Sequence, residues 1–284
     1  MEKKNANSAC AVIIVTHNSQ PYLATCLAHL KAQTRGPDKI IIVDSGSLDT
    51  GYLKSYAKDA KIELCLLKEN IGFCQGNNIG FSHVAPETNY VLFLNPDAFL
   101  WPSFISSAIS RMENIEGKNI GVLSGILLGY NLEKNAATGL IDSSGIFRSW
   151  YGKWYDRDQG KAYSETHFLN SEQVPAICGA LMFCRMQAIQ SVCLAPNQVM
   201  DESFFMYKED IDLSLRLRKK GWVLVFDPKL KAFHCRGWSI NRAKVPRVFR
   251  LMSAKNEMRL NARLKSPYYF YSALKYFAVK LFDK

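Results

Sequence analysis

The sequence predicts an α/β fold built around a central sheet, and three observations support this prediction. Short, largely apolar runs occur at 11–15, 39–43 and 90–94, the first two rich in Val and Ile, as is typical of strands buried on both faces. Segments with helical character separate these runs, and strands that alternate with helices form parallel sheets. Each run ends in polar residues, at the edge where such sheets bind ligands.

The elements follow in a regular order. A helix is expected over about 20–33, where Leu23, Leu27 and Leu30 recur at helical spacing. A Gly- and Asn-rich loop at 70–80 precedes the next helix. Further elements are expected as a strand at 62–67, a helix at 101–112, and strands at 120–128, 174–184, 223–226 and 229–233. No repeat or linker divides residues 1–235, so one domain with a C-terminal extension is predicted.

The basic charge is confined to the C-terminal segment. The chain has 284 residues and a net charge of +11. Residues 236–284 hold twelve Lys or Arg against two acids, which gives +10 and leaves +1 for the rest. A nucleic-acid-binding surface spread over the whole chain is therefore not indicated, and nucleic acid is not an expected partner.

The eight cysteines indicate a reducing compartment. None forms a CxxC pair, so we expect buried, reduced thiols rather than disulfides or a zinc site. The first ten residues lack the apolar run of a signal peptide, and no uncharged apolar run approaches the ~20 residues of a membrane-spanning helix. A cytoplasmic location is expected.

The most informative stretch is acidic and aromatic. Five carboxylates lie within residues 201–212, around an aromatic run, and a helix is expected from Leu213 to Lys220. Glu209 and Asp210 would then lie at a helix N-terminus. One interpretation is structural, with acids stabilised by the helix dipole and Asp212 paired with Arg216. The other is that one carboxylate takes a proton from an incoming hydroxyl.

Seven segments together resemble the family 2 inverting glycosyltransferases with the GT-A fold, and most closely their bacterial rhamnosyltransferase branch. The resemblance covers about residues 10–238. The matching segments are VIIVTHNS at 12–19, VDSGSLD at 43–49, NIGFCQGNNIG at 70–80, NPD at 95–97, CGALMFCR at 178–185, MDESFFMYKEDIDLSLR at 200–216 and FHCRGWS at 233–239. The implied fold is a Rossmann-like mixed sheet flanked by helices. It would comprise a catalytic domain at 1–238 and a helical extension at 239–284.

The resemblance also implies roles for individual residues. Asp210 would be the general base, with Glu209 beside it. Asp97 and His234 would bind a divalent metal, Mn²⁺ or Mg²⁺; Asn95 stands where the family often has the first Asp of its DxD motif, so one carboxylate is missing from that site. The donor nucleotide would be bound by Thr16, His17, Asn18, Asp44, Asn70, Gly72, Asn77, Asn78 and Asn95. The acceptor would contact Phe205 and Tyr207, and Trp150 and Trp154 could either stack on a sugar or cover a core.

The implied reaction is transfer of a sugar from a nucleotide-diphospho-sugar donor to a saccharide or lipid-linked saccharide in bacterial cell-surface polysaccharide synthesis. The sugar would be L-rhamnose from dTDP-rhamnose, with a UDP- or GDP-sugar as the alternative. A nucleotidyltransferase would need a basic phosphate loop, and residues 16–21 contain no Lys or Arg. A non-catalytic basic protein that binds membrane or nucleic acid is the alternative of another class.

The basic, aromatic extension at 239–284 leaves three options open. It could lie on an anionic membrane surface, such as the cytoplasmic face of the inner membrane. It could instead pack back on the domain, or form a homodimer.

Overall fold

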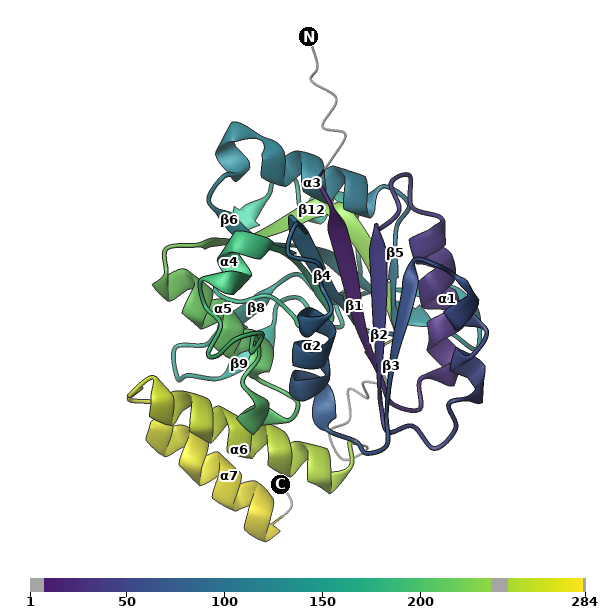
Figure 1. Ribbon diagram of the computed structural model, residues 1–284. Coiled ribbons are helices and arrows are strands. Elements are labelled where there is room, and N and C mark those ends of the chain that lie inside the picture. Colours follow the sequence, from purple (N-terminus) through teal and green to yellow (C-terminus); the bar gives the residue numbers. More distant parts are fainter. Residues whose placement is uncertain (1–7, 236–244, 283–284) are drawn as a thin grey trace.

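The computed structural model describes residues 8–235 and 245–282. A ten-stranded sheet forms the centre of the molecule, with a strand path of β10-β12-β6-β11-β4-β1-β2-β3 (Figure 1). The strands are β1 (Cys10–Thr16), β2 (Lys39–Ser45), β3 (Ile62–Leu67), β4 (Tyr90–Leu94), β5 (Ala98–Leu100), β6 (Ile120–Asn131), β7 (Ala136–Ser143), β10 (Glu172–Gln173), β11 (Leu181–Arg185) and β12 (Val223–His234). A separate hairpin pairs β8 (Ile146–Arg148) with β9 (Trp154–Asp156).

Seven α-helices lie in the described part of the chain. They are α1 (Gln20–Lys31), α2 (Gly72–Ser82), α3 (Phe104–Glu113), α4 (Met186–Gln190), α5 (Glu209–Lys219), α6 (Arg247–Arg263) and α7 (Tyr269–Phe282). None of the helices in the described ranges has the length and apolar character needed to cross a bilayer.

The sheet is mixed, as the resemblance implies. Strands β3, β2, β1 and β4 are parallel, which confirms the strand-and-helix alternation predicted for the first half. β11 then runs antiparallel to both β4 and β6, and β12 runs parallel to β6. The apolar runs of β1, β2 and β4 are buried on both faces. All eight cysteines are free thiols.

Three predicted boundaries were wrong. The predicted loop at 70–80 is helical from Gly72 onward, because its glycines let α2 lie directly on β1. A Cβ added at Gly76 would lie 2.7 Å from Val15, and one at Gly80 would lie 2.4 Å from Ile13. The runs at 223–226 and 229–233 form the single irregular strand β12. The run at 174–184 becomes a strand only at Leu181.

The second half of the sheet brings distant residues to the carboxyl ends of the parallel strands. β5 pairs antiparallel with the end of β12, so that His234 lies opposite Ala98. The backbone N–H of Cys235 donates to the Asp97 carbonyl at 2.9 Å. The end of β12 is therefore held beside the loop that follows β4.

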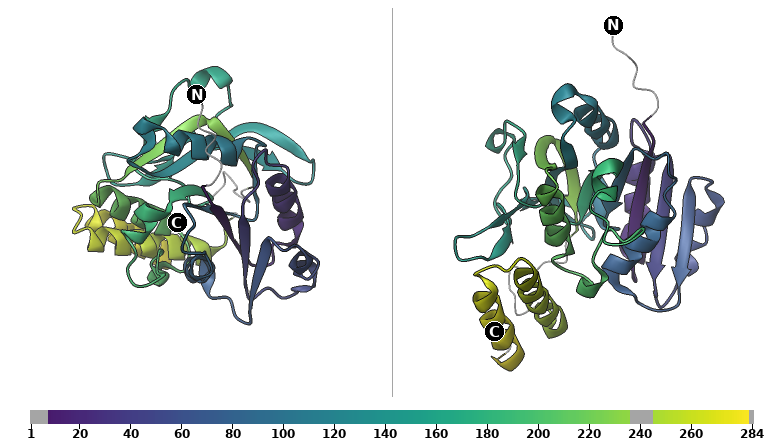
Figure 2. Two further views of the ribbon diagram at one scale, coloured as in Figure 1. Left: turned by 45° about the horizontal axis from the view of Figure 1, so that its top comes forward. Right: turned by 60° about the vertical axis from the view of Figure 1, so that its left-hand side comes forward.

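Helices α6 and α7 form an antiparallel hairpin at the end of the molecule opposite the amino terminus (Figures 1 and 2). Arg247 donates to the Lys280 carbonyl at one end of this hairpin, and Lys275 pairs with Glu257 nearer its middle. The predicted boundary at 238/239 and the last part of FHCRGWS lie outside the described residues.

Candidate active site

The ends of β1 and β2 bring the first predicted donor residues together. Thr16 and Asp44 are paired in the parallel register, and the Thr16 hydroxyl donates to Asp44 Oδ2 at 2.9 Å. Asp44 also accepts from the Ser47 backbone N–H at 2.9 Å and from its hydroxyl at 2.5 Å. Asp44 is fully buried. Its carboxylate therefore shapes the turn after β2, and a base could reach it only after this turn opens.

Other predicted donor residues form a polar rim above this turn. His17 Nδ1 lies 2.8 Å from the Ser45 carbonyl oxygen, and the Asn18 side-chain oxygen accepts from the Leu48 N–H at 2.9 Å. The Asn70 side-chain oxygen accepts from the Gly72 N–H at 3.0 Å. His17 and Asn18 are exposed, so this rim presents imidazole and amide groups to solvent.

Asn77 and Asn78, which were expected along the nucleotide, make hydrogen bonds within the protein. The Asn77 amide donates to the Phe73 carbonyl within α2 at 2.9 Å. Asn78 exchanges two hydrogen bonds of 2.8 Å with the backbone of Met200 and also donates to Glu202 at 3.1 Å. Both side chains are buried. Asn78 thus joins α2 to the acidic stretch.

The predicted metal ligands face one another. His234 Nε2 lies 3.3 Å from Asp97 Oδ1, and His234 Nδ1 lies 2.8 Å from Asp142 Oδ2. Burial opposes the charged imidazolium, but the two carboxylates outweigh this effect and raise the pKa of His234 to about 9. Burial also opposes ionisation of Asp97, yet the facing imidazole holds the pKa of Asp97 below its usual value. The His234 imidazole therefore lies between two carboxylates, those of Asp97 and Asp142.

Asp142 was missed by sequence reasoning. It lies near the end of β7, 92 residues from His234, and reaches it because the β6–β7 register shifts between Leu127 and Leu128. The only signal in the sequence was an Asp at the end of an apolar pair, Leu140 and Ile141.

These residues fit a divalent cation. A carboxylate and an imidazole are suitable ligands for Mn²⁺, and a ligating histidine commonly donates its other ring N–H to a carboxylate, as His234 does to Asp142. The side-chain oxygen of Asn95, the DxD-position residue, is buried without a hydrogen-bond partner in the described part of the chain. Across residues 8–235 and 245–282, no group of three or more His, Cys, Asp or Glu side chains is arranged so that it could hold a metal ion. An ion bound by Asp97 and His234 would need donor phosphates or water as its other ligands.

Asp210 lies in the first turn of α5. The turn at residues 178–180 connects it to Asn95, which is near Asp97. The Asn95 N–H donates to the Ala180 carbonyl at 3.0 Å, and the adjacent Gly179 N–H donates to Asp210 Oδ2 at 3.1 Å. The Ile211 N–H donates to Asp210 Oδ1 at 2.8 Å. An added Cβ at Gly179 would lie 3.2 Å from the Asp210 Cβ, so a side chain there would crowd Asp210.

The acids of α5 differ in their partners. One forms the ion pair expected under the structural interpretation, and the other two are candidates for accepting a proton. Asp212 pairs with Arg216 at 2.8 Å, which confirms the ion pair predicted from the sequence. Glu209 and Asp210 have no Lys or Arg partner within the described residues, and Glu209 Oε2 is buried without a hydrogen bond there. Burial and the Asp210 carboxylate raise the pKa of Glu209 to about 8. Burial also raises the pKa of Asp210, while its two backbone donors act against this shift.

Glu209 should make stability fall as pH rises. Its folded-state pKa of about 8 exceeds the ordinary 4.5, so its contribution is full below about pH 4.5 and is lost as pH rises through about 8. Between about pH 6 and pH 8.5, the free energy of unfolding should drop by about 2 kcal/mol more in the wild type than in Glu209→Gln. Thermal melts across this range measure the difference, with the exposed Glu87→Gln as matched control. Parallel curves for wild type and Glu209→Gln would contradict the assignment.

The predicted acceptor residues lie in a strained loop before α5. Phe205, Tyr207 and Lys208 have φ of 60°, 71° and 74°, a left-handed conformation that costs about 1–2 kcal/mol for each such residue. The Phe205 ring covers Gly72, where a Cβ would lie 2.5 Å away. Tyr207 is 39% exposed, and its ring lies edge-on to Phe249 of α6.

Helix α6 holds this loop in place. The Asn256 amide donates to three loop carbonyls, those of Phe204 at 2.7 Å, Met206 at 2.8 Å and Tyr207 at 3.0 Å. Arg259 donates to the Ser203 carbonyl, and Arg263 pairs with Asp201. Sequence reasoning missed Asn256, because nothing local marks an Asn within a basic helix as a partner of a loop 49–52 residues away.

The two tryptophans have different surroundings. Trp154 is buried in the hydrophobic core, with Arg148 over its ring at 5.4 Å. The core-covering alternative therefore applies to Trp154, and its assignment to the acceptor is corrected. Trp150 is 88% exposed at the tip of the β8–β9 hairpin.

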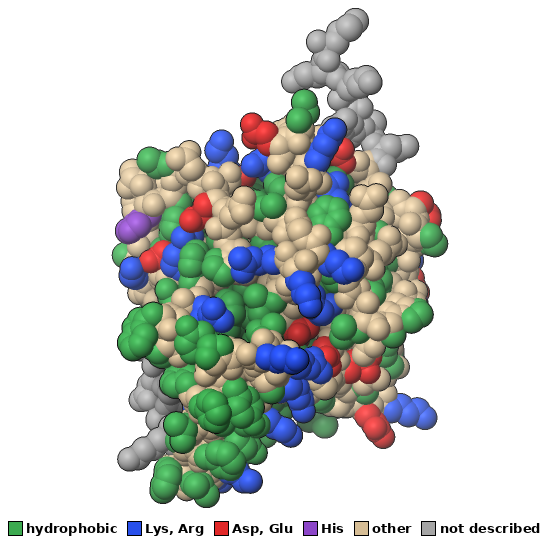
Figure 3. Space-filling model, turned by 90° about the vertical axis from the view of Figure 1, so that its left-hand side faces the viewer, with side chains coloured by type: hydrophobic (Ala, Val, Ile, Leu, Met, Phe, Trp, Pro, Cys, Tyr) green, Lys and Arg blue, Asp and Glu red, His purple; other side chains and the backbone are tan. Residues whose placement is uncertain are grey.

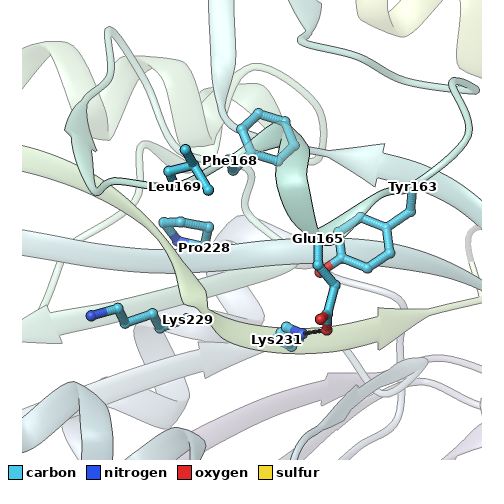
Figure 4. A pocket seen from close by; sticks show the side chains of 7 residues that line it. All are labelled: Tyr163, Glu165, Phe168, Leu169, Pro228, Lys229 and Lys231. Atoms are coloured by element: carbon cyan, nitrogen blue, oxygen red, sulfur yellow. Dashed lines mark hydrogen bonds and ion pairs between the residues drawn. The ribbon is translucent and has the colours of Figure 1, made fainter.

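A separate hollow of about 400 Å³ lies between the 163–169 segment and β12 (Figure 4). It is lined by Tyr163, Glu165, Phe168, Leu169, Pro228, Lys229 and Lys231. Lys231 pairs with Glu165 at 2.7 Å, as the dashed line in Figure 4 shows. None of the predicted site residues lines this hollow, so we assign neither donor nor acceptor to it.

Solved structures share the fold. Over 91% of this chain and 48% of the other, the protein superposes on GalNAc-T7, whose structure is described as containing UDP, GalNAc and Mn²⁺, with a TM-score of 0.68 and 14% identity. It also superposes on the mannosyltransferase PcManGT of Pyrobaculum calidifontis, in complex with GDP-Man and Mn²⁺, with a TM-score of 0.60 and 14% identity over 98% of this chain and 72% of the other. The GT-A fold implied by the sequence is thereby confirmed.

Curated relatives and a family model complete the comparison. The chain is 24% identical over 244 residues to an N-acetylglucosaminyl-diphospho-decaprenol L-rhamnosyltransferase of Mycobacterium tuberculosis, which covers 81% of this chain and 77% of that protein. It is 24% identical over 228 residues to the rhamnosyltransferase WbbL of Escherichia coli, covering 78% and 82%. Residues 11–190 match the model of glycosyl transferase family 2. The chain therefore belongs to glycosyl transferase family 2 and is a glycosyltransferase.

Proposed function

We propose that the protein transfers a sugar from a nucleotide-diphospho-sugar to an acceptor hydroxyl by a single inverting displacement, with Asp210 as general base. One observation carries this proposal. Asp210 is fixed by two backbone N–H groups and is joined through the 178–180 turn to Asn95, next to the Asp97–His234 pair. In this proposal the base and the donor-phosphate site would lie on either side of one turn.

The neighbouring carboxyl groups of Glu209 and Asp210 have different surroundings. The Gly179 and Ile211 N–H groups donate to Asp210 and favour its ionised form, whereas burial and the Asp210 carboxylate raise the pKa of Glu209 to about 8. In the proposed step the acceptor oxygen bonds to the anomeric carbon, the bond from that carbon to the diphosphate oxygen breaks, and the hydroxyl proton passes to Asp210. No protein nucleophile is required.

Asp97 and His234 would hold the divalent metal, with Asp142 orienting the imidazole. Such an ion, when bound, neutralises the charge of the departing diphosphate. The Mn²⁺ named with two structures of the same fold supports this assignment. Thr16, His17, Asn18, Asn70 and Gly72 would then surround the base and ribose, and Asp44 would join them when its turn opens. Phe205, Tyr207 and Trp150 stay candidates for the acceptor side.

The relatives support a more specific proposal. Two of them are rhamnosyltransferases, and one is named for a diphospho-decaprenol acceptor. We therefore assign L-rhamnose from dTDP-rhamnose as the donor and a saccharide, free or lipid-linked, as the acceptor. The reaction would serve the assembly of bacterial cell-surface polysaccharide.

A thermal-shift panel tests the donor assignment. dTDP, UDP and GDP and their sugars are added to the full chain with and without Mn²⁺. A ligand that binds only the folded state at ~100 times its Kd stabilises by ~2.7 kcal/mol. A Mn²⁺-dependent shift with dTDP compounds alone supports the proposal. A shift with UDP or GDP compounds alone overturns the rhamnosyl assignment, and no shift with any nucleotide contradicts the donor site.

Replacing Asp142 should weaken the metal site without removing a ligand. Asp142→Ala should bind Mn²⁺ about 10–100-fold more weakly, because the His234 imidazole loses the carboxylate that orients it. Titration of the purified protein with Mn²⁺, followed by electron paramagnetic resonance of the free ion, measures this affinity. Asp59→Ala, an exposed Asp in a turn, is the control. Equal Mn²⁺ affinities in folded Asp142→Ala and wild type would show that Asp142 has no orienting role.

A further inference from the structure

Helix α7 presents an uncovered apolar stripe. Phe270, Leu274, Phe277 and Leu281 are 75%, 72%, 51% and 67% exposed. Their spacing of four, three and four residues places them on one side of the helix. Ser272 and Val279 lie on the opposite side and are buried. The stripe therefore points away from the protein body.

An exposed tryptophan of the β8–β9 hairpin lies near the start of α7. The Tyr268 hydroxyl donates to the Trp150 carbonyl at 2.8 Å, and the Tyr151 and Tyr271 rings meet edge to face at 5.7 Å. These contacts hold Trp150 beside the start of α7. We call the four stripe residues together with Trp150 the α7 face. Figure 3 shows apolar side chains gathered over this end of the molecule, with Lys and Arg along their border.

The charge around the α7 face has one sign. Residues 245–282 contain eight Lys or Arg and one acid, Glu257, a net charge of +7. Glu257 is buried and paired with Lys275, so it does not offset the charge at the surface. Lys265 and Lys280 are exposed. A second copy of the chain docked here would bring two positive borders together, whereas an anionic surface complements them.

We propose that the α7 face docks in the plane of an anionic lipid bilayer. The aromatic and Leu side chains would enter the boundary between headgroups and acyl chains, and the border lysines would lie among the anionic headgroups. Trp150 suits this depth, because its ring is apolar and its indole N–H is polar. The α6–α7 hairpin also holds the loop before α5, through Asn256 of α6. The proposed membrane contact and the candidate acceptor loop are therefore linked through α6.

Vesicle flotation of the full chain tests this proposal without relying on enzyme activity. Vesicles of phosphatidylcholine alone are compared with vesicles in which one-third of the lipid is phosphatidylglycerol, at low and at high salt. The anionic vesicles should bind the protein, and binding should weaken as salt rises because the border charges are screened. Phe270→Ser combined with Phe277→Ser should lower the partition coefficient by about tenfold or more.

Matched variants distinguish membrane binding by the α7 face from non-specific binding by other exposed apolar or basic side chains. Ile115→Ser with Leu194→Ser removes two exposed apolar side chains elsewhere and should leave binding unchanged. Lys265→Gln with Lys280→Gln should weaken binding to anionic vesicles, whereas Lys118→Gln with Lys229→Gln should have a much smaller effect. All variants should keep the wild-type melting temperature, since each changed side chain is exposed.

Three results would overturn the proposal. The first is no flotation with anionic vesicles at low salt. The second is equal binding by the α7-face variant and its matched control. The third is a dimer, measured by light scattering, that the α7-face variant converts to a monomer while vesicles fail to bind; a second copy would then be the occupant.

Discussion

Asp210→Asn should lower kcat by about 10²–10⁴-fold while the donor nucleotide still binds. The amide has nearly the size of the carboxylate but cannot accept the proton of the incoming hydroxyl. Its side chain also faces the Gly179 and Ile211 N–H groups, which donate to a carboxylate in the wild type. A transfer assay gives kcat, and the thermal shift with nucleotide reports donor binding.

Two comparisons make this result specific. Asp59→Asn, which changes an exposed Asp at a turn, should keep wild-type kcat. Asp212→Asn removes the ion pair with Arg216 and should lower stability more than turnover. If Asp210→Asn retains turnover within a few-fold of wild type, Asp210 is not the base, and Glu209 becomes the next candidate.

Asn256→Ala should lower the free energy of unfolding by about 2–4 kcal/mol, because three buried or partly buried loop carbonyls lose their common donor. For a chain of this size the melting temperature should fall by roughly 5–10 °C. Turnover should fall as well, since the left-handed residues before α5 lose the contact that holds them. Thermal melts and the transfer assay measure the two effects.

Asn256→Asp sharpens the test, because it keeps the size of the side chain and replaces its donors by a carboxylate that faces three carbonyl oxygens. It should destabilise at least as much as Asn256→Ala. Asn170→Ala, at an exposed position, should behave as wild type. Unchanged melting temperatures for both Asn256 variants would show that the loop holds its conformation without α6.

Local pattern was enough to predict the parallel half of the sheet. The apolar runs of β1, β2 and β4 are buried on both faces, so the sequence indicates where each strand reaches its carboxyl end. Thr16 and Asp44 follow from this register, as does the position of Asp97 after β4. The Asp212–Arg216 pair was also predictable, since residues four apart on a helix face one another.

Long-range contacts explain what sequence reasoning missed. Asp142 reaches His234 only through an irregular strand pairing, and Asn256 reaches the acceptor loop through the docking of a separate helix. Asn77 and Asn78 looked like loop residues because glycines surround them, but those glycines let a helix lie against β1. The burial of Trp154 depends on how the β8–β9 hairpin packs, which no local pattern encodes.

The hydrogen bonds from Asn256 to the loop before α5 can form only after both segments have been synthesised. The ribosome makes Phe204 52 residues before it makes Asn256, and Tyr207 49 residues before. A nascent chain can therefore complete the donor strands while the carbonyls of this loop still face water and its left-handed residues are free to relax. Catalytic competence would then arrive late, when α6 leaves the ribosomal tunnel and closes over a loop made about 3–10 seconds earlier.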